Sequence, residues 1–108
     1  MTSNSINFDV DKAINWFKKA AELDNYTALF NLGCIYKDGI GVTKDHVLAF
    51  NYFEKAAEHD EADALYELAD CYLNGIGTKP NIKKARALFA RSADMGNEKA
   101  LSILGNLK

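Results

Sequence analysis

The sequence predicts an all-α protein: a right-handed superhelical α-solenoid of antiparallel helix hairpins. Three observations predict this fold. The 108 residues align with themselves without a gap at an offset of 36, the composition is rich in alanine with a single proline, and each repeat carries two apolar stripes at helical spacing. A chain of this length is one domain, so we expect a single repeat domain over residues 1–108.

The repeat is visible as columns of like residues. Ala13, Ala49 and Ala85 stand 36 positions apart. The same offset aligns Trp16 with Tyr52 and Leu88, Phe17 with Phe53 and Phe89, Ala28 with Ala64 and Ala100, Leu32 with Leu68 and Leu104, and Gly33 with Ala69 and Gly105. So many ungapped columns indicate about three copies of one helical hairpin.

Each repeat holds a helix A and a helix B, and the chain reads in the order B-A-B-A-B-A. The approximate units are a half repeat over residues 1–23, repeats over 24–59 and 60–95, and a half repeat over 96–108. Short connections make neighbouring helices antiparallel, so that hairpins stack with contacts mainly between neighbours.

Helix B is predicted over residues 10–23 and again over 46–59. Its alanines, together with Trp16 and Phe17 or Tyr52 and Phe53, form one apolar stripe that we expect to be buried. Helix A is predicted over residues 26–37, and its core stripe consists of Ala28, Leu29, Leu32, Ile35 and Tyr36. The column of Gly33 is expected to mark the closest contact between the two helices, where a bulky residue would separate them.

Residues at the helix ends agree with this division. Asp9, Asp45 and Asn81 share one column just before helix B, and each is a good N-cap. Gly39 and Gly75 follow helix A, where a left-handed residue is wanted, and Pro80 lies just outside the third helix B.

With these columns in view, the chain resembles the Sel1-like repeat family, a relative of the tetratricopeptide repeats. The residues that carry the resemblance are Ala28, Leu32-Gly33, Tyr36, Gly39-Ile40-Gly41-Val42, Asp45, Ala49, Tyr52-Phe53 and Ala56-Ala57. The match covers nearly the whole chain. Asp24 and Asp60 depart from the family pattern, because they stand where it usually has the glycine kept here as Gly96. Tetratricopeptide repeats are the nearest alternative, but their usual period is about 34 and they lack the two-glycine loop.

The resemblance implies a function class. Such proteins look like adaptors that assemble or regulate other proteins, and the resemblance implies no catalytic residues. In the cysteine-rich branch of the family, paired cysteines occur near positions that hold Ala57 and Leu65 here. That difference argues against a disulfide-dependent extracellular protein.

Composition and charge disfavour other partners. The formal net charge of −2 provides no basic field for nucleic acid, and no stretch reaches the roughly 18 apolar residues of a membrane span. Residues 1–10 lack the features of a secretory signal. These features favour a cytoplasmic location for the chain as given, with a periplasmic or secreted location left open.

No enzymatic, metal or cofactor site is predicted. The loops at Gly39-x-Gly41 and Gly75-x-Gly77 follow helices, whereas a phosphate-binding fingerprint needs a preceding strand and a third glycine, so they are interpreted as repeat-specific turns. His46 and His59 lack the spacing of a helical metal pair. The carboxylates of Asp60 and Glu61 are explained by capping at a helix junction.

The two cysteines are expected to differ in exposure. Cys71 aligns with Ile35 and Leu107 and should be buried, whereas Cys34 aligns with Asp70 and Asn106 and should be exposed. A bond between Cys34 and Cys71 is therefore not expected, and neither thiol has a base partner in the sequence pattern.

The side of helix A opposite its core stripe is the candidate binding surface, because inner helices of such arrays line a concave groove. Its columns vary while the frame repeats. The predicted partner-binding residues are Thr27, Phe30, Asn31, Cys34, Asp63, Tyr66, Glu67 and Asp70. Phe30 and Tyr66 are the proposed aromatic anchors. Helical phase alone leaves open whether these two rings face the groove or pack into the core.

The leading hypothesis is a non-enzymatic scaffold that binds a protein or peptide along the helix-A groove. The alternative is a purely structural segment of a longer solenoid or an oligomerisation module, because a chain that begins with helix B and stops in helix A leaves both end faces uncovered. Excision from a longer array and self-association through those ends are both open. An enzyme is a third hypothesis, without any nucleophile, base and orienting group behind it.

Overall fold

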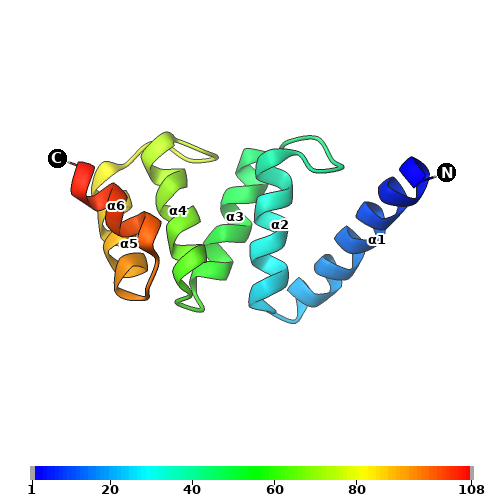
Figure 1. Cartoon of the computed structure of the whole chain (residues 1–108), viewed down its shortest axis with the longest axis horizontal. Coiled ribbons are helices and arrows are strands. Elements are labelled where there is room, and N and C mark those ends of the chain that lie inside the picture. Colours follow the sequence, from blue (N-terminus) through cyan, green and yellow to red (C-terminus); the bar gives the residue numbers. More distant parts are fainter. Residues whose placement is uncertain (1, 108) are drawn as a thin grey trace.

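The computed structural model describes residues 2–107, with side chains from Val10 onward, as six α-helices and no strand. The helices are α1 (Thr2–Glu22), α2 (Tyr26–Asp38), α3 (His46–Ala57), α4 (Ala62–Asn74), α5 (Ile82–Asp94) and α6 (Glu98–Asn106). Helices α1, α3 and α5 are the B helices, and α2, α4 and α6 are the A helices. The predicted all-α solenoid is confirmed (Figure 1).

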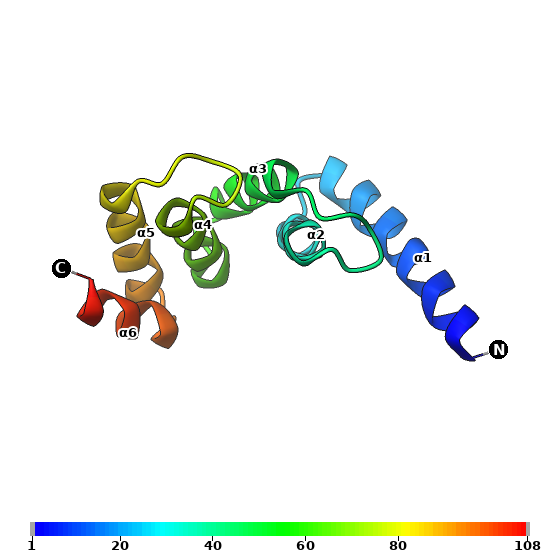
Figure 2. The same ribbon diagram turned by 90° about the horizontal axis from the view of Figure 1, so that it is seen from above.

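The six helices form an elongated, curved array with extents of 50 × 24 × 23 Å. Seen from above, α2, α4 and α6 lie on the inner side of the curve, and α3 and α5 lie on its outer side (Figure 2). Each helix packs mainly on the helices before and after it in sequence. Stacking of neighbours is what a repeat with short connections dictates.

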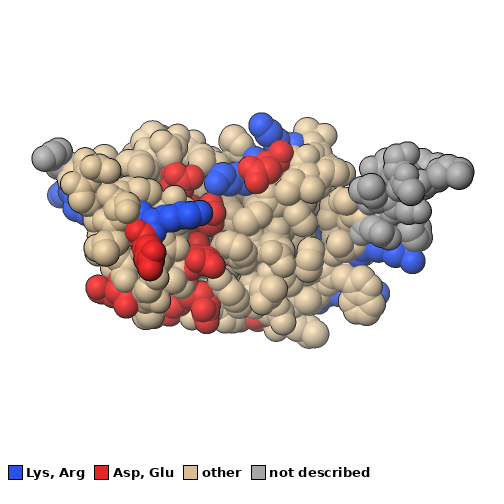
Figure 3. Space-filling model, viewed as in Figure 1, with Lys and Arg blue, Asp and Glu red and all other residues tan. Residues whose placement is uncertain are grey.

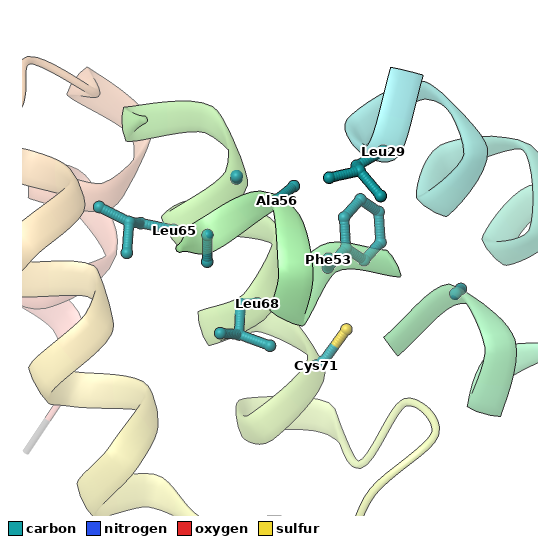
Figure 4. Close-up of a cluster of buried hydrophobic side chains, with 9 residues drawn as sticks. Leu29, Phe53, Ala56, Leu65, Leu68 and Cys71 are labelled. Carbon is teal, nitrogen blue, oxygen red and sulfur yellow. The ribbon is translucent and has the colours of Figure 1, made fainter. Parts of the chain in front are cut away.

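The core is continuous across the repeat boundaries. Its largest cluster joins α2, α3 and α4 around the buried Phe53 ring, with Leu29 on one side and Leu65, Leu68 and Cys71 on the other (Figure 4). The alanine columns predicted to face the core are fully buried where the structure has helices on both sides, as at Ala49 and Ala85. Small side chains there let the helix backbones approach closely.

Most helix ends follow the predicted chemistry. The carboxylate of Asp45 accepts from the backbone N–H of Leu48 (3.0 Å), and the amide oxygen of Asn81 accepts from that of Lys84 (3.1 Å). Gly39 and Gly75 end α2 and α4 with φ of 71° and 69°, as the left-handed cap requires. The prediction for Asp9 is wrong, because α1 begins at Thr2 and Asp9 lies inside the helix.

The turn before each A helix uses one backbone conformation. Asp24 and Asp60 have φ of 61° and 59°, and Gly96 in the same column has φ of 105°. The family's usual glycine is therefore replaced by aspartate, which tolerates the left-handed region better than most residues. Glu61 is the N-cap residue of α4 but makes no side-chain capping bond, so the capping interpretation of this carboxylate is wrong.

The two-glycine loops pack onto the preceding B helix. A Cβ at Gly77 would fall against the backbone carbonyl of His46 in α3, and a Cβ at Gly41 would fall against the Val10 side chain in α1. Both glycines have positive φ, of 74° and 72°. The second glycine of each loop is therefore required for two reasons: its positive φ, and the close approach of the loop to the B helix.

The exposure of Trp16 corrects a prediction. Its side chain is 71% exposed, although its stripe was expected to be buried. The column partner Tyr52 stacks on Tyr36 of the preceding A helix, with ring centroids 6.0 Å apart. Within the described residues no A helix lies before α1, so the indole has nothing to pack against.

Candidate functional site: the concave hollow

The inner side of the curve carries a hollow of about 510 Å³ between α2, α4 and the start of α6. It is lined by Phe30 of α2, by Asp63, Tyr66 and Glu67 of α4, and by Gly96, Asn97, Glu98 and Lys99. Four of the eight predicted binding residues therefore meet in one place. The hollow is open to solvent, and its volume lies within the range of about 300–1,000 Å³ that is typical of binding pockets.

Phe30 and Tyr66 answer a question that helical phase left open. Both are half-buried, and both line the hollow. Phe30 lies edge-on to Phe53 with centroids 5.9 Å apart, and Tyr66 lies edge-on to Phe89 at 5.6 Å. Each ring thus packs one side on the next B helix, which holds it in place, and leaves another side facing the hollow.

Most of the charged residues that line the hollow are acidic. Acidic side chains gather over the α4 and α6 half of this face, whereas the surface over α2 is mostly uncharged (Figure 3). Asp63 accepts a hydrogen bond from the Asn97 amide (3.1 Å), which ties α4 to the turn before α6. The Tyr66 hydroxyl has a raised pKa, because of burial and the nearby charges of Asp70 and Glu67.

Lys37 of α2 partly neutralises the acidic wall. Its Nζ lies 3.0 Å from Glu67 Oε1 and 3.5 Å from Asp70 Oδ2. Burial would lower the pKa of Lys37, but the hydrogen bond to Glu67 and the two carboxylate charges outweigh it and raise that pKa to about 12. This ion pair joins two successive A helices across the inner face and fixes the position of Glu67.

The other predicted residues lie beside the hollow or away from it. Asp70 is half-buried, accepts a hydrogen bond from the Asn74 amide, and forms an ion pair with Lys37. Thr27 is exposed and Asn31 is half-buried, and neither lines the hollow. Cys34 packs against the central core cluster.

The predicted binding residues did not include residues 96–99, which line the hollow. The turn before α6 closes one end of the hollow because Gly96 adopts positive φ and Asn97 caps α6, with its side chain accepting from the N–H of Ala100. The signal was available in part, since Lys99 shares the column of Thr27 and Asp63. The proximity of α6 to α4 could not be read from one column.

The comparisons with known proteins agree with this architecture. A family model described as Sel1 repeat matches residues 9–25, 27–61 and 62–97. The chain belongs to the Sel1 repeat family. No curated protein matches it.

Solved structures of Sel1 repeat proteins superimpose closely. A Sel1 repeat protein from Oxalobacter formigenes gives a TM-score of 0.85 at 37% identity, over 90% of this chain and 73% of that one. Helicobacter pylori cysteine rich protein B gives 0.81 at 31%, over 87% and 71%. The protective antigen c5321 of uropathogenic Escherichia coli, which displays an SLR fold, gives 0.83 at 33%; the match covers 86% of this chain and 20% of the antigen.

Sel1 repeat proteins are generally protein-interaction scaffolds and are typically not catalytic. The described part of this Sel1 chain holds no group of three or more His, Cys, Asp or Glu side chains placed to bind a metal ion. His59 Nε2 lies 3.4 Å from an Asp24 carboxylate oxygen. Across residues 2–107 no helix is long and apolar enough to cross a membrane.

The two thiols of this Sel1 chain are free, and both are shielded. Cys71 is fully buried, as predicted, and burial raises its pKa to about 12. Cys34 is half-buried rather than exposed, because α3 and α4 pack close to its column, and burial together with Glu67 raises its pKa to about 11. Neither thiol is activated as a nucleophile.

We expect slow thiol chemistry and a loss of stability at alkaline pH. At pH 8 an electrophile should modify Cys34 before Cys71, and both far more slowly than in urea-unfolded chain, because the thiolate is the reactive form. In the unfolded chain both thiols deprotonate near the ordinary cysteine pKa of 9.0, whereas the folded chain retains those protons. The folded state then binds more protons, so stability falls as pH rises from about 9 toward 12.

The measurement is the urea midpoint from pH 7 to pH 10.5, with mass spectrometry of alkylated peptides. The matched variant is Cys71→Ala, which should flatten the alkaline decline relative to its own value at pH 7. A decline of unchanged steepness in this variant would assign the effect to other groups.

Proposed function

We propose that this Sel1 chain is a non-enzymatic scaffold that binds a peptide segment or protein surface in the concave hollow. The proposed contact residues are Thr27, Phe30, Asn31, Cys34, Asp63, Tyr66, Glu67 and Asp70. Phe30, Asp63, Tyr66 and Glu67 form the centre, and the other four form its margin. The family's general role as protein-interaction scaffolds supports the class of function.

The observation that carries the proposal is the pair of anchored aromatic rings facing an open acidic hollow. Phe30 and Tyr66 pack on Phe53 and Phe89, so little side-chain freedom is left to lose when a partner binds. Aromatic residues that are held in this way are frequent interface hot spots. The hollow therefore suits an apolar side chain of the partner.

The charge of the lining suggests the rest of the partner's chemistry. Asp63, Glu67 and Glu98 line the hollow together with a single lysine, Lys99. A lysine or arginine next to the apolar anchor would complement these carboxylates and would also speed association. We infer a partner segment in which a basic residue flanks an apolar one.

The test is a selection from a random peptide library on the immobilised chain, followed by affinities from fluorescence anisotropy. Selected peptides should be enriched in lysine or arginine beside a large apolar residue. The double variant Asp63→Asn with Glu67→Gln should weaken them by about tenfold, in line with the loss of two attractive charges at an interface.

The matched control removes two carboxylates from the outer side. Glu54→Gln with Glu58→Gln, on α3 and its C-cap, changes the net charge equally and should leave affinity within about twofold. If both double variants lose affinity equally, the effect comes from net charge and not from the hollow. Unchanged affinity after Phe30→Ala with Tyr66→Ala would remove the hollow from the binding surface.

A further inference from the structure

Both ends of the solenoid expose apolar residues whose column partners are more buried. Trp16 of α1 is 71% exposed, and Leu101 of α6 is 64% exposed. In the interior of the array, the residues that share the column of Leu101 are buried: Leu29 is 1% exposed and Leu65 is 0% exposed. These two exposed residues lie on opposite ends of the molecule and are not part of the concave hollow.

The interior repeats show how a B helix normally packs on the A helix before it. Helix α3 packs on α2, and a Cβ at Gly33 of α2 would lie only 2.6 Å from the Phe53 ring. The equivalent glycine of α6, Gly105, has nothing within 4 Å of its Cβ position. Phe17 of α1, the counterpart of Phe53, is only half-buried, whereas Phe53 is 0% exposed. At the α6 end, Gly105 has no aromatic ring of the described residues packed against it. At the α1 end, the Phe17 ring has no preceding glycine within the described residues to pack against.

Two crevices lie between successive repeats, and the same six columns line both of them. The first is lined by Lys18, Ala21, Glu22, Leu29, Tyr52 and Lys55. The second includes their counterparts 36 residues on, Glu54, Ala57, Glu58, Leu65, Leu88 and Arg91. In each crevice the later B helix supplies a large apolar side chain and a basic residue, and the earlier hairpin supplies a leucine and a carboxylate.

The two ends of the chain hold the separated halves of a third crevice. Trp16 and Lys19 of α1 share a surface depression and occupy the columns of the large apolar and basic residues. Leu101 of α6 and the exposed Asp94 at the end of α5 occupy the columns of the leucine and the carboxylate. The two halves are complementary in hydrophobicity and charge, since each brings an exposed apolar residue and the charges of Lys19 and Asp94 are opposite.

We propose that this chain associates head to tail with a second copy, with α1 of one molecule packing on α6 of the next as α3 packs on α2. Trp16 then covers Leu101 of the second copy, Phe17 lies over its Gly105, and Lys19 lies near its Asp94. The two faces are different, so each joined molecule offers a free face for the next. Only one helix packs on one hairpin in this arrangement, so we expect a small interface and a weak, concentration-dependent association.

The test uses sedimentation velocity over about 10 µM to about 1 mM, the range in which weak association is populated. The weight-average mass of the unmodified chain should rise with concentration. Trp16→Glu and Leu101→Glu should each stay monomeric, because each removes one of the two faces. The control Val47→Glu alters a residue of α3 that is 60% exposed and should associate like the unmodified chain.

Mixing the two single variants gives the decisive readout. Trp16→Glu retains an intact α6 face and Leu101→Glu retains an intact α1 face, so an equimolar mixture should form a 1:1 dimer that grows no further. If the unmodified chain is a monomer at every concentration, the proposal is overturned. That result is expected if these faces serve only to pack on flanking repeats. Dimers of Leu101→Glu alone overturn it in favour of symmetric pairing through α1.

Loss of fold is separated from loss of association by circular dichroism and urea midpoints of each variant. Both substituted side chains are mainly exposed, so the helical signal should be unchanged. Should either variant lose helix, Trp16→Gln and Leu101→Gln replace the pair, and the same mixing result is required. Failure of the mixture to dimerise with both folds intact rejects the head-to-tail arrangement.

Discussion

Replacement of Phe53 by alanine is expected to remove a large part of the stability of the domain. Phe53 is fully buried where α2, α3 and α4 meet, and it contacts Phe30 and the backbone of Gly33. Truncation of a buried phenylalanine costs about 3–5 kcal/mol, because apolar contacts are lost and a cavity remains. Domains of this size have total stabilities of about 5–15 kcal/mol. Urea unfolding followed by circular dichroism measures the change.

The matched control is Phe50→Ala, three residues earlier on the same helix. Phe50 is half-buried and meets Tyr72 edge-on with centroids 5.5 Å apart. Its truncation removes the same atoms from a position that partial exposure makes less costly, so we expect about 1–2 kcal/mol. Equal losses for the two variants would show that the core is not centred on Phe53.

The second large effect is expected for Gly77→Ala. Gly77 has φ of 74°, and its missing Cβ would fall against the His46 carbonyl and, at 2.8 Å, the Phe50 Cβ. A left-handed non-glycine residue costs about 1–3 kcal/mol by itself. Backbone cannot move aside as a side chain can, so the loop must also shift away from α3. We therefore expect the free energy of unfolding, measured by urea titration, to fall by more than that range.

Gly41→Ala provides the control for this substitution. Gly41 occupies the same loop position with φ of 72°, but its Cβ would meet the side chain of Val10, which can change rotamer. This variant should show the backbone strain without the clash. The difference between the two variants therefore measures how tightly the second loop packs on α3. Equal destabilisation would mean that conformation alone explains the requirement for glycine.

The candidate site was predicted in part. Column reasoning identified the inner face of helix A, and four of its eight residues line one hollow. It could not decide the placement of Phe30 and Tyr66, since a residue at the edge of a helical stripe can contact both core and solvent. The contribution of residues 96–99 depends on the approach of α6 to α4, which a single column does not encode.

The sequence alone determined the repeat, the order of helices and most of their ends. These properties are local, because periodicity, capping side chains and left-handed glycines act within a few residues, as at Asp45 and Gly39. Only the tertiary structure decided which members of a column are covered. Trp16 is exposed although Tyr52 is half-buried, and Cys34 is shielded although its column is polar. Burial depends on the neighbouring hairpin, and a terminal repeat has one neighbour where an inner repeat has two.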